Sequence, residues 1–370
     1  MINLFSNLVV RLRTWLVAFA LVVISSNLQA YQEGAWLYQI DVPVASQNAA
    51  DRKAAASSGL LSVLSRVSGL SSVPRNAEIA AALAQPQRYY TAYNYSSVPT
   101  NAGNQMQVSF SFQRDAVVAL AYAAQLPLWW EARPEIVVWL AVEQNGRRTL
   151  LNAASDHPLV AQVLAYAQQR GLPVQFPILD LTDQLAVSTS DVWGRTSAID
   201  DGSARYGADI VLVGRFRQQM GTSGANSVAA QGLGREAVFT GDWEFWFAEQ
   251  PVTVPVKAQT VPTTAAAGLQ GVAELLTSRY AVLPRGLQTT SLQVADVNSV
   301  QRYAQLISYL GTFEFVQNLQ VKSVADGLVY LSLQTHAKPE QLALLLTAQA
   351  RLVKLESFVA FDGLALRWSG

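Results

Sequence analysis

Few residues of this chain have the type and spacing that chemistry requires. Its only two histidines are His157 and His336. His157 follows Asp156 at a predicted helix start, where it could act as an Asp-oriented base or as a helix cap. The cap is the favoured interpretation, because no serine lies in a G-x-S-x-G nucleophile elbow. Two isolated histidines also cannot form an H-E-x-x-H zinc site, so the sequence predicts no catalytic residue and no metal site.

The carboxylates form no recognisable catalytic or calcium-binding pattern. Asp200 and Asp201 stand together in "AIDDGSA", with Asp191 nearby, but the alternating acids and distal Glu of a calcium loop are missing. This segment is predicted to be a solvated helix edge. A hydrolase of envelope material that uses carboxylates such as Asp191, Asp200 or Glu135 remains an alternative function.

Cofactor chemistry finds little support in the sequence. The Gly-rich segment 221–234 lacks both the G-x-G-x-x-G spacing and a Walker lysine, and it is predicted to be a hairpin loop. The chain has no cysteine. This excludes disulfides, thiolate catalysis, cysteine-based zinc sites and a lipidated amino terminus. We therefore predict no cofactor.

Aromatic residues give the richer signal. They gather in "RYYTAYNY", "LPLWWEARP" and "DWEFWF". Alternation along a strand "DWEFWF" places Trp243, Phe245 and Phe247 on one face and Trp246 on the other. Because Tyr and Trp are enriched at interfaces, these segments either fill a core or form a surface for a protein or glycan partner. The candidate interaction surface consists of Tyr90, Tyr93, Trp129, Trp130 and Trp246.

The elements that must position these residues begin after a typical export signal. Arg11 and Arg13 precede the apolar stretch "TWLVAFALVVI", and "SSNLQA" ends at the small residue Ala30. The apolar stretch is about a dozen residues, short of the ~20 that span a bilayer. Residues 1–30 are predicted to be a cleaved Sec-type signal peptide, which leaves a soluble periplasmic chain from Tyr31. An uncleaved inner-membrane anchor is the alternative, and no later segment is apolar enough to span.

Composition indicates packed domains without a nucleic-acid partner. Hydrophobic residues make up 51% of the sequence and charged residues 14%, which is typical of folded domains. A chain of 370 residues is too long for one ordinary core. Lys+Arg and Asp+Glu both number 26, and removal of the signal with its two arginines leaves an excess of two acids. Such a chain has no electrostatic footprint for nucleic acid or for an anionic membrane surface.

Three domains are predicted after the signal. Residues 31–130 show the order β-α-α-β-β-α, beginning with a strand over 35–44, and predict a two-layer α+β sandwich. Residues 134–282 predict a central α/β domain with a mixed sheet. The runs "EIVVWLAV" and "DIVLVGRF" are continuously apolar, as in strands buried on both faces, and a helix is expected over 193–206.

Residues 286–370 predict a third domain. Their order β-α-β-β-α-β, with "LVKLES" as the last strand, is the ferredoxin-like split βαβ pattern. This scaffold hosts many functions, so it carries little functional information.

Several segments resemble a known family. The segments "YQIDVPVASQNAADRKAAASSGLLSVLSRVSG", "PEIVVWLAVEQNGRRTLL" and "YGADIVLVGRF" are similar to an uncharacterised exported Gram-negative family, a domain of unknown function (DUF2066). The family has no established catalytic residues, so the resemblance implies none here. Residues 134–280 also resemble the α/β domain of envelope assembly proteins. These are the TolB amino-terminal domain, the curli secretion lipoprotein and lipoprotein activators of penicillin-binding proteins.

We therefore expect a non-enzymatic accessory or interaction protein of the cell envelope, whose partner is an envelope protein or glycan. A carboxylate-dependent hydrolase and a small-ligand binding module, the latter with an apolar pocket between domains, remain the alternatives. The segment "YGADIVLVGRF" is predicted to be scaffold, because Gly207 allows the chain to reverse after a helix and Asp209 can accept hydrogen bonds at the turn.

Overall fold

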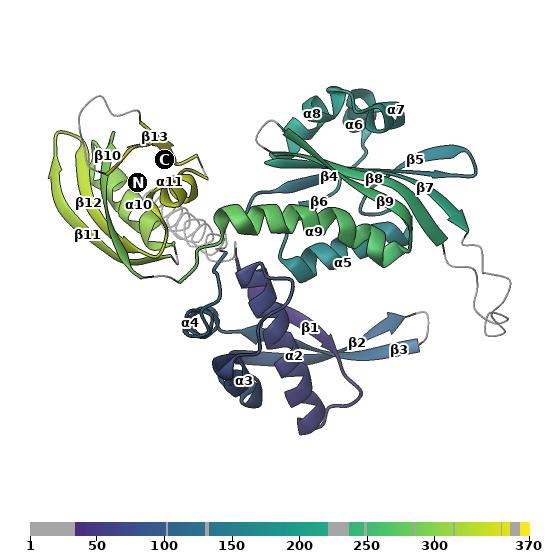
Figure 1. The fold of residues 1–370 in the computed structure, drawn as a ribbon, viewed down its shortest axis with the longest axis horizontal. Coiled ribbons are helices and arrows are strands. Elements are labelled where there is room, and N and C mark those ends of the chain that lie inside the picture. Colours follow the sequence, from purple (N-terminus) through teal and green to yellow (C-terminus); the bar gives the residue numbers. More distant parts are fainter. Residues whose placement is uncertain are drawn as a thin grey trace, which may run out of the picture. The chain divides into compact units, whose positions relative to one another are not determined.

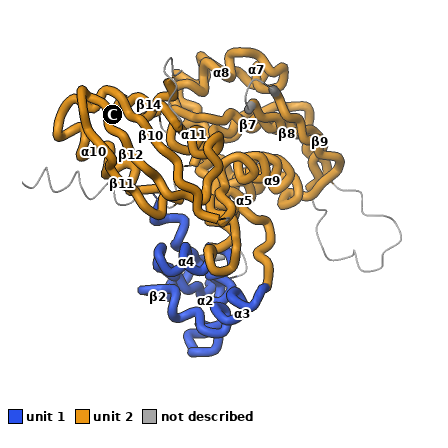
Figure 2. The backbone as a smooth tube through the Cα atoms, turned by 60° about the vertical axis from the view of Figure 1, so that its left-hand side comes forward, with its two compact units in different colours: residues 1–63, 76–120 blue, residues 64–75, 121–370 orange. Residues whose placement is uncertain are grey.

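The computed structural model describes residues 34–100, 103–129, 133–220, 237–247, 250–284, 286–313, 315–348, 350–355 and 363–370. They contain both helices and sheets, grouped in two compact units (Figure 2). The first unit comprises the described residues up to Val63 together with Asn76–Leu120, and the second comprises Leu64–Arg75 with Ala121–Gly370. The predicted class, a multidomain chain of α+β and α/β type, is confirmed.

The first unit is built around a three-stranded antiparallel sheet. Its elements are η1 (Ala35–Tyr38), β1 (Gln39–Pro43), α2 (Ala49–Ser68), α3 (Ala77–Ala84), η2 (Pro86–Arg88), β2 (Tyr90–Thr100), β3 (Gly103–Phe112) and α4 (Arg114–Ala123). The strand order is β1-β3-β2, so β2 lies at an edge. The unit boundaries fall within α2 and α4. The predicted β-α-α-β-β-α order is confirmed, but the first strand is shorter than expected, because η1 occupies its beginning.

Helix α2 packs on the apolar face of this sheet. A Cβ at Gly59 would lie 3.1 Å from Ile40 and 3.3 Å from Phe112, so the glycine allows the helix to approach both strands closely. Val108, Phe110 and Phe112 alternate along β3 as its buried positions. The intervening residues Gln107, Ser109 and Ser111 are polar and partly buried on the opposite face.

The central part of the second unit is an α/β arrangement (Figure 1). Its strands are β4 (Ile136–Gln144), β5 (Arg147–Leu151), β6 (Val174–Gln175), β7 (Ile210–Met220), β8 (Ala237–Phe247) and β9 (Gln250–Gln259). Its helices are α5 (Pro158–Arg170), α6 (Leu181–Ala186), α7 (Thr189–Gly194), α8 (Ala198–Ser203), η3 (Ala204–Tyr206) and α9 (Val261–Tyr280). The strands run in the order β5-β4-β7-β8-β9, with β6 beside β4; β4 is parallel to β6 and β7.

Helices cover both faces of this sheet, as the continuously apolar strands predicted. Helices α5 and α9 lie along one face, and α6, α7 and α8 lie along the other (Figure 1). Alternate residues of β4 divide between two cores: Val138 and Leu140 pack with the α5 and α9 side, and Val137 and Trp139 with the α7 and α8 side. The predicted mixed sheet is confirmed by the strand directions, because β4 and β7 are parallel whereas β7 and β8 are antiparallel.

The described residues of 288–368 form a five-stranded sheet with two helices. Its elements are β10 (Gln288–Ala295), α10 (Val300–Gly311), β11 (Val316–Ala325), β12 (Leu328–Thr335), α11 (Pro339–Thr347), β13 (Leu352–Lys354) and β14 (Leu364–Trp368). The order is β11-β12-β10-β14-β13, with β10 and β14 parallel. The prediction that "LVKLES" is the last strand was wrong, because it contains β13 and a further strand, β14, follows. Strand β14 lies between β10 and β13 and runs parallel to β10, whereas all neighbours in a ferredoxin-like sheet are antiparallel, so β14 is an insertion into that pattern.

The predicted limits of the three domains stay a prediction, since the central and carboxy-terminal sheets belong to one compact unit. The predicted signal peptide, residues 1–30, lies outside the described residues. Within the part of the chain that is described, no helix is long and apolar enough to cross a membrane.

Candidate functional site

The parallel strands β4 and β7 end at different points. Their pairing runs from Ile136 opposite Ile210 to Glu143 opposite Arg217. Beyond this pair β4 stops and turns into β5 through Asn145, whose φ is 53°, and Gly146, whose φ is 77°. Both residues tolerate positive φ, as a tight hairpin turn requires. Strand β7 continues for three more residues, 218–220, whose strand partner among the described residues is β8.

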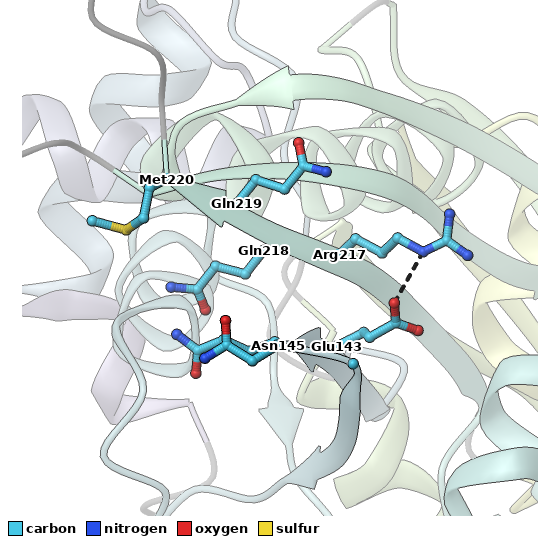
Figure 3. A pocket seen from close by; sticks show the side chains of 8 residues that line it. Glu143, Asn145, Arg217, Gln218, Gln219 and Met220 are labelled. Atoms are coloured by element: carbon cyan, nitrogen blue, oxygen red, sulfur yellow. Dashed lines mark ion pairs between the residues drawn. The ribbon is translucent and has the colours of Figure 1, made fainter.

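A pocket occupies this end of the sheet (Figure 3). Its volume is about 370 Å³, and it lies at the carboxyl ends of two parallel strands. In open α/β sheets this edge is where ligands usually bind. The pocket is lined by Glu143, Gln144, Asn145, Gly146, Arg217, Gln218, Gln219 and Met220.

The charges at the pocket are already paired. Oε1 of Glu143 lies 3.3 Å from Nε of Arg217, and Oε2 accepts a hydrogen bond from Nε of Arg148 at 2.8 Å. The hydrogen bond from Arg148 is the largest cause that lowers the pKa of Glu143, and Arg217 lowers the pKa further. The Arg148 guanidinium also stacks 4.1 Å from the centre of the Trp193 ring. The remaining polar side chains of the pocket are uncharged amides.

His157 connects this pocket to helix α5. Its Nδ1 accepts a hydrogen bond from the backbone N–H of Leu159, which makes His157 the cap of α5. Its Nε2 lies 3.1 Å from Oε1 of Gln218. The helix-cap interpretation of His157 is thus supported, and its second nitrogen orients a pocket amide. His336 instead lies against the ring of Tyr122, with centroids 5.3 Å apart.

The predicted tyrosines lie together on strand β2 of the first unit. Ring centroids of Tyr90 and Tyr93 are 6.1 Å apart, and those of Tyr93 and Tyr95 are 5.8 Å apart. The Arg52 guanidinium lies 4.9 Å from the centre of the Tyr93 ring, and its Nη1 donates to the Tyr95 hydroxyl at 3.4 Å. Tyr93 is 45% exposed, whereas Tyr90 is partly buried. We call Tyr90, Tyr93 and Tyr95 the tyrosine surface.

The predicted tryptophans do not join this surface. Trp129 is 1% exposed and packs in the core of the second unit, so its assignment to an interaction surface is wrong in this structure. The Arg133 guanidinium lies 4.0 Å from the centre of this indole and helps to cover it. Trp130 lies outside the described residues. Trp246 is partly buried and packs on the α7 and α8 side of the sheet.

The three carboxylates proposed for the hydrolase alternative have separate local roles. Asp191 forms a capping box with Ser188 and also accepts from Thr196 at 2.8 Å, and these hydrogen bonds lower its pKa. Asp200 stands exposed in the first turn of α8. Burial and the nearby Asp209 carboxylate raise the pKa of Glu135. Within the described ranges, no group of three His, Cys, Asp or Glu residues could hold a metal ion.

A carboxylate pair that the sequence did not indicate lies on β8. Glu244 is 1% exposed and forms ion pairs with Arg195 and Arg215. Nη2 of Arg215 also lies 2.5 Å from Oδ1 of Asp242. Arg195 ends α7 with a φ of 59°, so this network holds α7 on the sheet. Because a guanidinium neutralises each carboxylate, the arrangement is suited to holding the helix rather than to acid-base chemistry.

A second network fixes the neighbouring helix α6. Arg205 binds both oxygens of Asp180 and also Oδ1 of Asp183, at 2.8 to 3.0 Å. The fully buried Asp183 carboxylate also accepts from the Tyr206 hydroxyl at 2.5 Å. The hydrogen bond from Arg205 is the main cause that lowers the pKa of Asp180 to about 2. This network ties α6 to the segment just before β7.

The pocket was not among the sequence-based site predictions. Asn145-Gly146 is a dipeptide typical of a hairpin turn, but the lining of the pocket depends on how far β7 extends past β4. That difference is set by long-range pairing and has no local sequence signal. The predicted Gly-rich loop 221–234 lies outside the described residues.

Comparison with known proteins gives a match to a family model over the first part of the chain. Residues 32–130 match the model of a family described as a domain of unknown function (DUF8605). For these residues the predicted resemblance to a domain of unknown function is confirmed, but the matching family is DUF8605 and not the predicted DUF2066. No curated protein and no solved structure matches the chain.

Proposed function

We propose that this protein is a non-enzymatic accessory protein of the Gram-negative cell envelope that is exported to the periplasm and binds a protein partner through strand β2. The observation that carries the proposal is the long uncharged edge of β2 beside the tyrosine surface. The partner contributes an extended strand, which pairs with β2 and extends the three-stranded sheet.

Strand β2 keeps the features that permit such pairing. Among the described residues it pairs only with β3, so its other side has no strand neighbour. Natural edge strands are usually blunted by charges, prolines or bulges. Strand β2 has a bulge before Ala92 and a proline at Pro99. The stretch "AYNYSSV" between these two positions contains no bulge, no proline and no charged residue. An extended peptide can add to an edge of this kind.

The tyrosine surface adds side-chain contacts to this edge. Tyrosine is enriched at protein interfaces because its ring buries a large apolar area and its hydroxyl remains hydrogen-bonded. Arg52 already stacks on Tyr93 and binds the hydroxyl of Tyr95. These contacts restrict the two rings before binding, which reduces the entropy lost when a partner packs on them.

The envelope location rests on the sequence. The order of positive residues, short apolar stretch and small residue in positions 1–30 supports export. The resemblance of 134–280 to the α/β domains of envelope assembly proteins, and of the longer segments to DUF2066, supports a role among exported proteins. The low content of charged residues, 14%, suits a protein that works through apolar and main-chain contacts.

The partner surface is tested by crosslinking and recovery from envelopes. Asn94→Lys places a charge on the β2 edge, and Tyr93→Ala removes the exposed ring. Gln39→Lys is the matched control, because Gln39 is equally exposed on β1, at the other edge of the same sheet. The wild-type chain and the control should recover the same specific protein. Both β2 variants should recover roughly tenfold less of this protein, or even less, as when an interface anchor is removed.

Two results would contradict this proposal. One is recovery of the same partner at full yield by both β2 variants. The other is recovery of an envelope glycan and no specific protein. Export is tested separately by the intact mass of the chain from the periplasmic fraction, which should begin at Tyr31; membrane-bound chain that retains Met1 would reject the export step.

A further inference from the structure

The pocket at the end of β4 contains a stretch of unpaired strand edge. Strand β7 pairs with β4 up to Arg217 and then extends through residues 218–220, which pair only with β8 in the described structure. Backbone N–H and C=O groups on an unpaired side need other partners, either water or an added chain. The hairpin turn at Asn145 closes one end of this stretch and gives it the shape of a notch (Figure 3).

The side chains around the notch match the chemistry of a peptide group. Four of the eight lining residues carry a carboxamide: Gln144, Asn145, Gln218 and Gln219. A carboxamide offers donors and an acceptor together, as a peptide unit does. The Oε1 atom of Gln218 is held by His157, so its Nε2 amide is the end left to donate into the pocket.

The charge balance selects against ionic ligands. Glu143 is paired with Arg217 inside the pocket and with Arg148 beside it. A charged ligand would have to compete with these pairs, whereas a neutral ligand leaves them in place. The only apolar side chain of the lining is Met220, a flexible residue that adapts to different neighbouring shapes.

We propose that this pocket binds a short, extended, uncharged peptide segment that lies beside residues 218–220 as an added strand. Main-chain hydrogen bonds to β7 form with a peptide of any sequence. The carboxamide side chains form hydrogen bonds with the peptide groups on the side of the bound peptide that faces away from β7. A volume of about 370 Å³ is at the small end of ligand pockets and accommodates only a few residues. A peptide is favoured over a saccharide because the lining offers strand edge and no aromatic ring on which a sugar would stack. This site is independent of the β2 edge.

The test is a titration of the full mature chain, followed by backbone amide NMR signals. The probe is a pool of acetylated, amidated tetrapeptides made of Ala, Ser, Gln and Tyr; chitotetraose is titrated in parallel. The peptides should shift the signals of residues 143–146 and 217–220 with saturation in the micromolar to low millimolar range. Absence of saturable shifts at these residues up to about 10 mM peptide overturns the proposal. A response to chitotetraose without one to peptide overturns it as well.

Two variants confirm where the probe binds. Asn145→Gly removes a carboxamide while keeping a residue that tolerates the positive φ of the turn. Gln219→Ala removes an exposed amide from β7 and does not touch the turn, so it serves if the first variant disturbs the hairpin. Each should weaken peptide binding by roughly fivefold, the effect of one lost hydrogen bond. Gln320→Ala, an exposed glutamine on β11, is the matched control and should bind as the wild type. If all three variants bind the peptides with the affinity of the wild type, the proposed site is wrong.

Discussion

Trp243 of β8 and Gly268 of α9 are in direct contact. A Cβ at position 268 would lie 2.5 Å from Cγ of the indole, so only glycine leaves room for the ring. The indole Nε1 donates to the backbone carbonyl of Thr264, one turn earlier in the same helix, at 2.7 Å. Shape and hydrogen bonding together fix the position of α9 on the sheet that carries the pocket.

Because of this contact, substitution by alanine should have opposite effects on stability at two glycines of α9. Gly268→Ala should destabilise the second unit by about 2 kcal/mol, because overpacking outweighs the better helix propensity of alanine. Gly271→Ala should stabilise it by up to about 1 kcal/mol, because a Cβ there meets Phe245 and Val254 at ordinary contact distances of 3.5 and 3.6 Å. Urea denaturation followed by tryptophan fluorescence measures both. Equal effects of the two variants would contradict the close contact.

The buried and exposed carboxylates of this sheet should respond differently to neutralisation. Glu244→Gln leaves two arginines beside a neutral amide in a buried site, and it should cost about 3 kcal/mol. Glu143→Gln removes ion pairs with Arg148 and Arg217 that lie near the solvent, so it should lower stability much less than Glu244→Gln. Denaturation midpoints at neutral pH compare them. A Glu244 variant as stable as the wild type would show that the network contributes nothing.

The Asp180–Arg205 pair gives an acid-sensitive contribution to stability. Because the pKa of Asp180 is lowered to about 2, below the ~3.9 of an unfolded chain, the charged form stabilises the folded state above pH ~4. This contribution is lost as the pH falls from ~4 through about 2. Arg205→Gln should raise the pKa of Asp180 towards its ordinary value, as measured by carboxyl carbon NMR. An unchanged pKa in this variant would assign the shift to the helix-cap hydrogen bonds instead.

The elements with strong local patterns could be predicted from the sequence. Continuous apolar runs revealed β4 and β7, and His157 marked the start of α5. The long helix expected over 193–206 was wrong. The chain forms the short helices α7 and α8 there, because Arg195 adopts a left-handed conformation after the capping box that begins α7.

The sites were harder to predict because they depend on contacts between distant residues. The cap role of His157 is local and was anticipated, but its contact with Gln218 joins residues 61 positions apart. The burial of Trp129 follows from packing in the second unit, and a pair of tryptophans beside a proline does not indicate it. Strand alternation, in contrast, correctly placed Trp243 and Trp246 on opposite faces of β8.

Trp246 provides the last test. Strand alternation sends Trp246 to the face opposite Trp243, towards either a core or a partner surface, and the structure places it against the core formed by β4, β7, α7 and α8. Trp246→Ala should lower stability by about 2 kcal/mol, less than the 3–5 kcal/mol of a fully buried aromatic because its ring is only partly covered. Tyr93→Ala, at an exposed position of the first unit, should change stability by no more than about 0.5 kcal/mol. Thermal melts of both purified variants decide between the roles. An unshifted midpoint for Trp246→Ala would reject core packing and return this residue to the candidate partner surface.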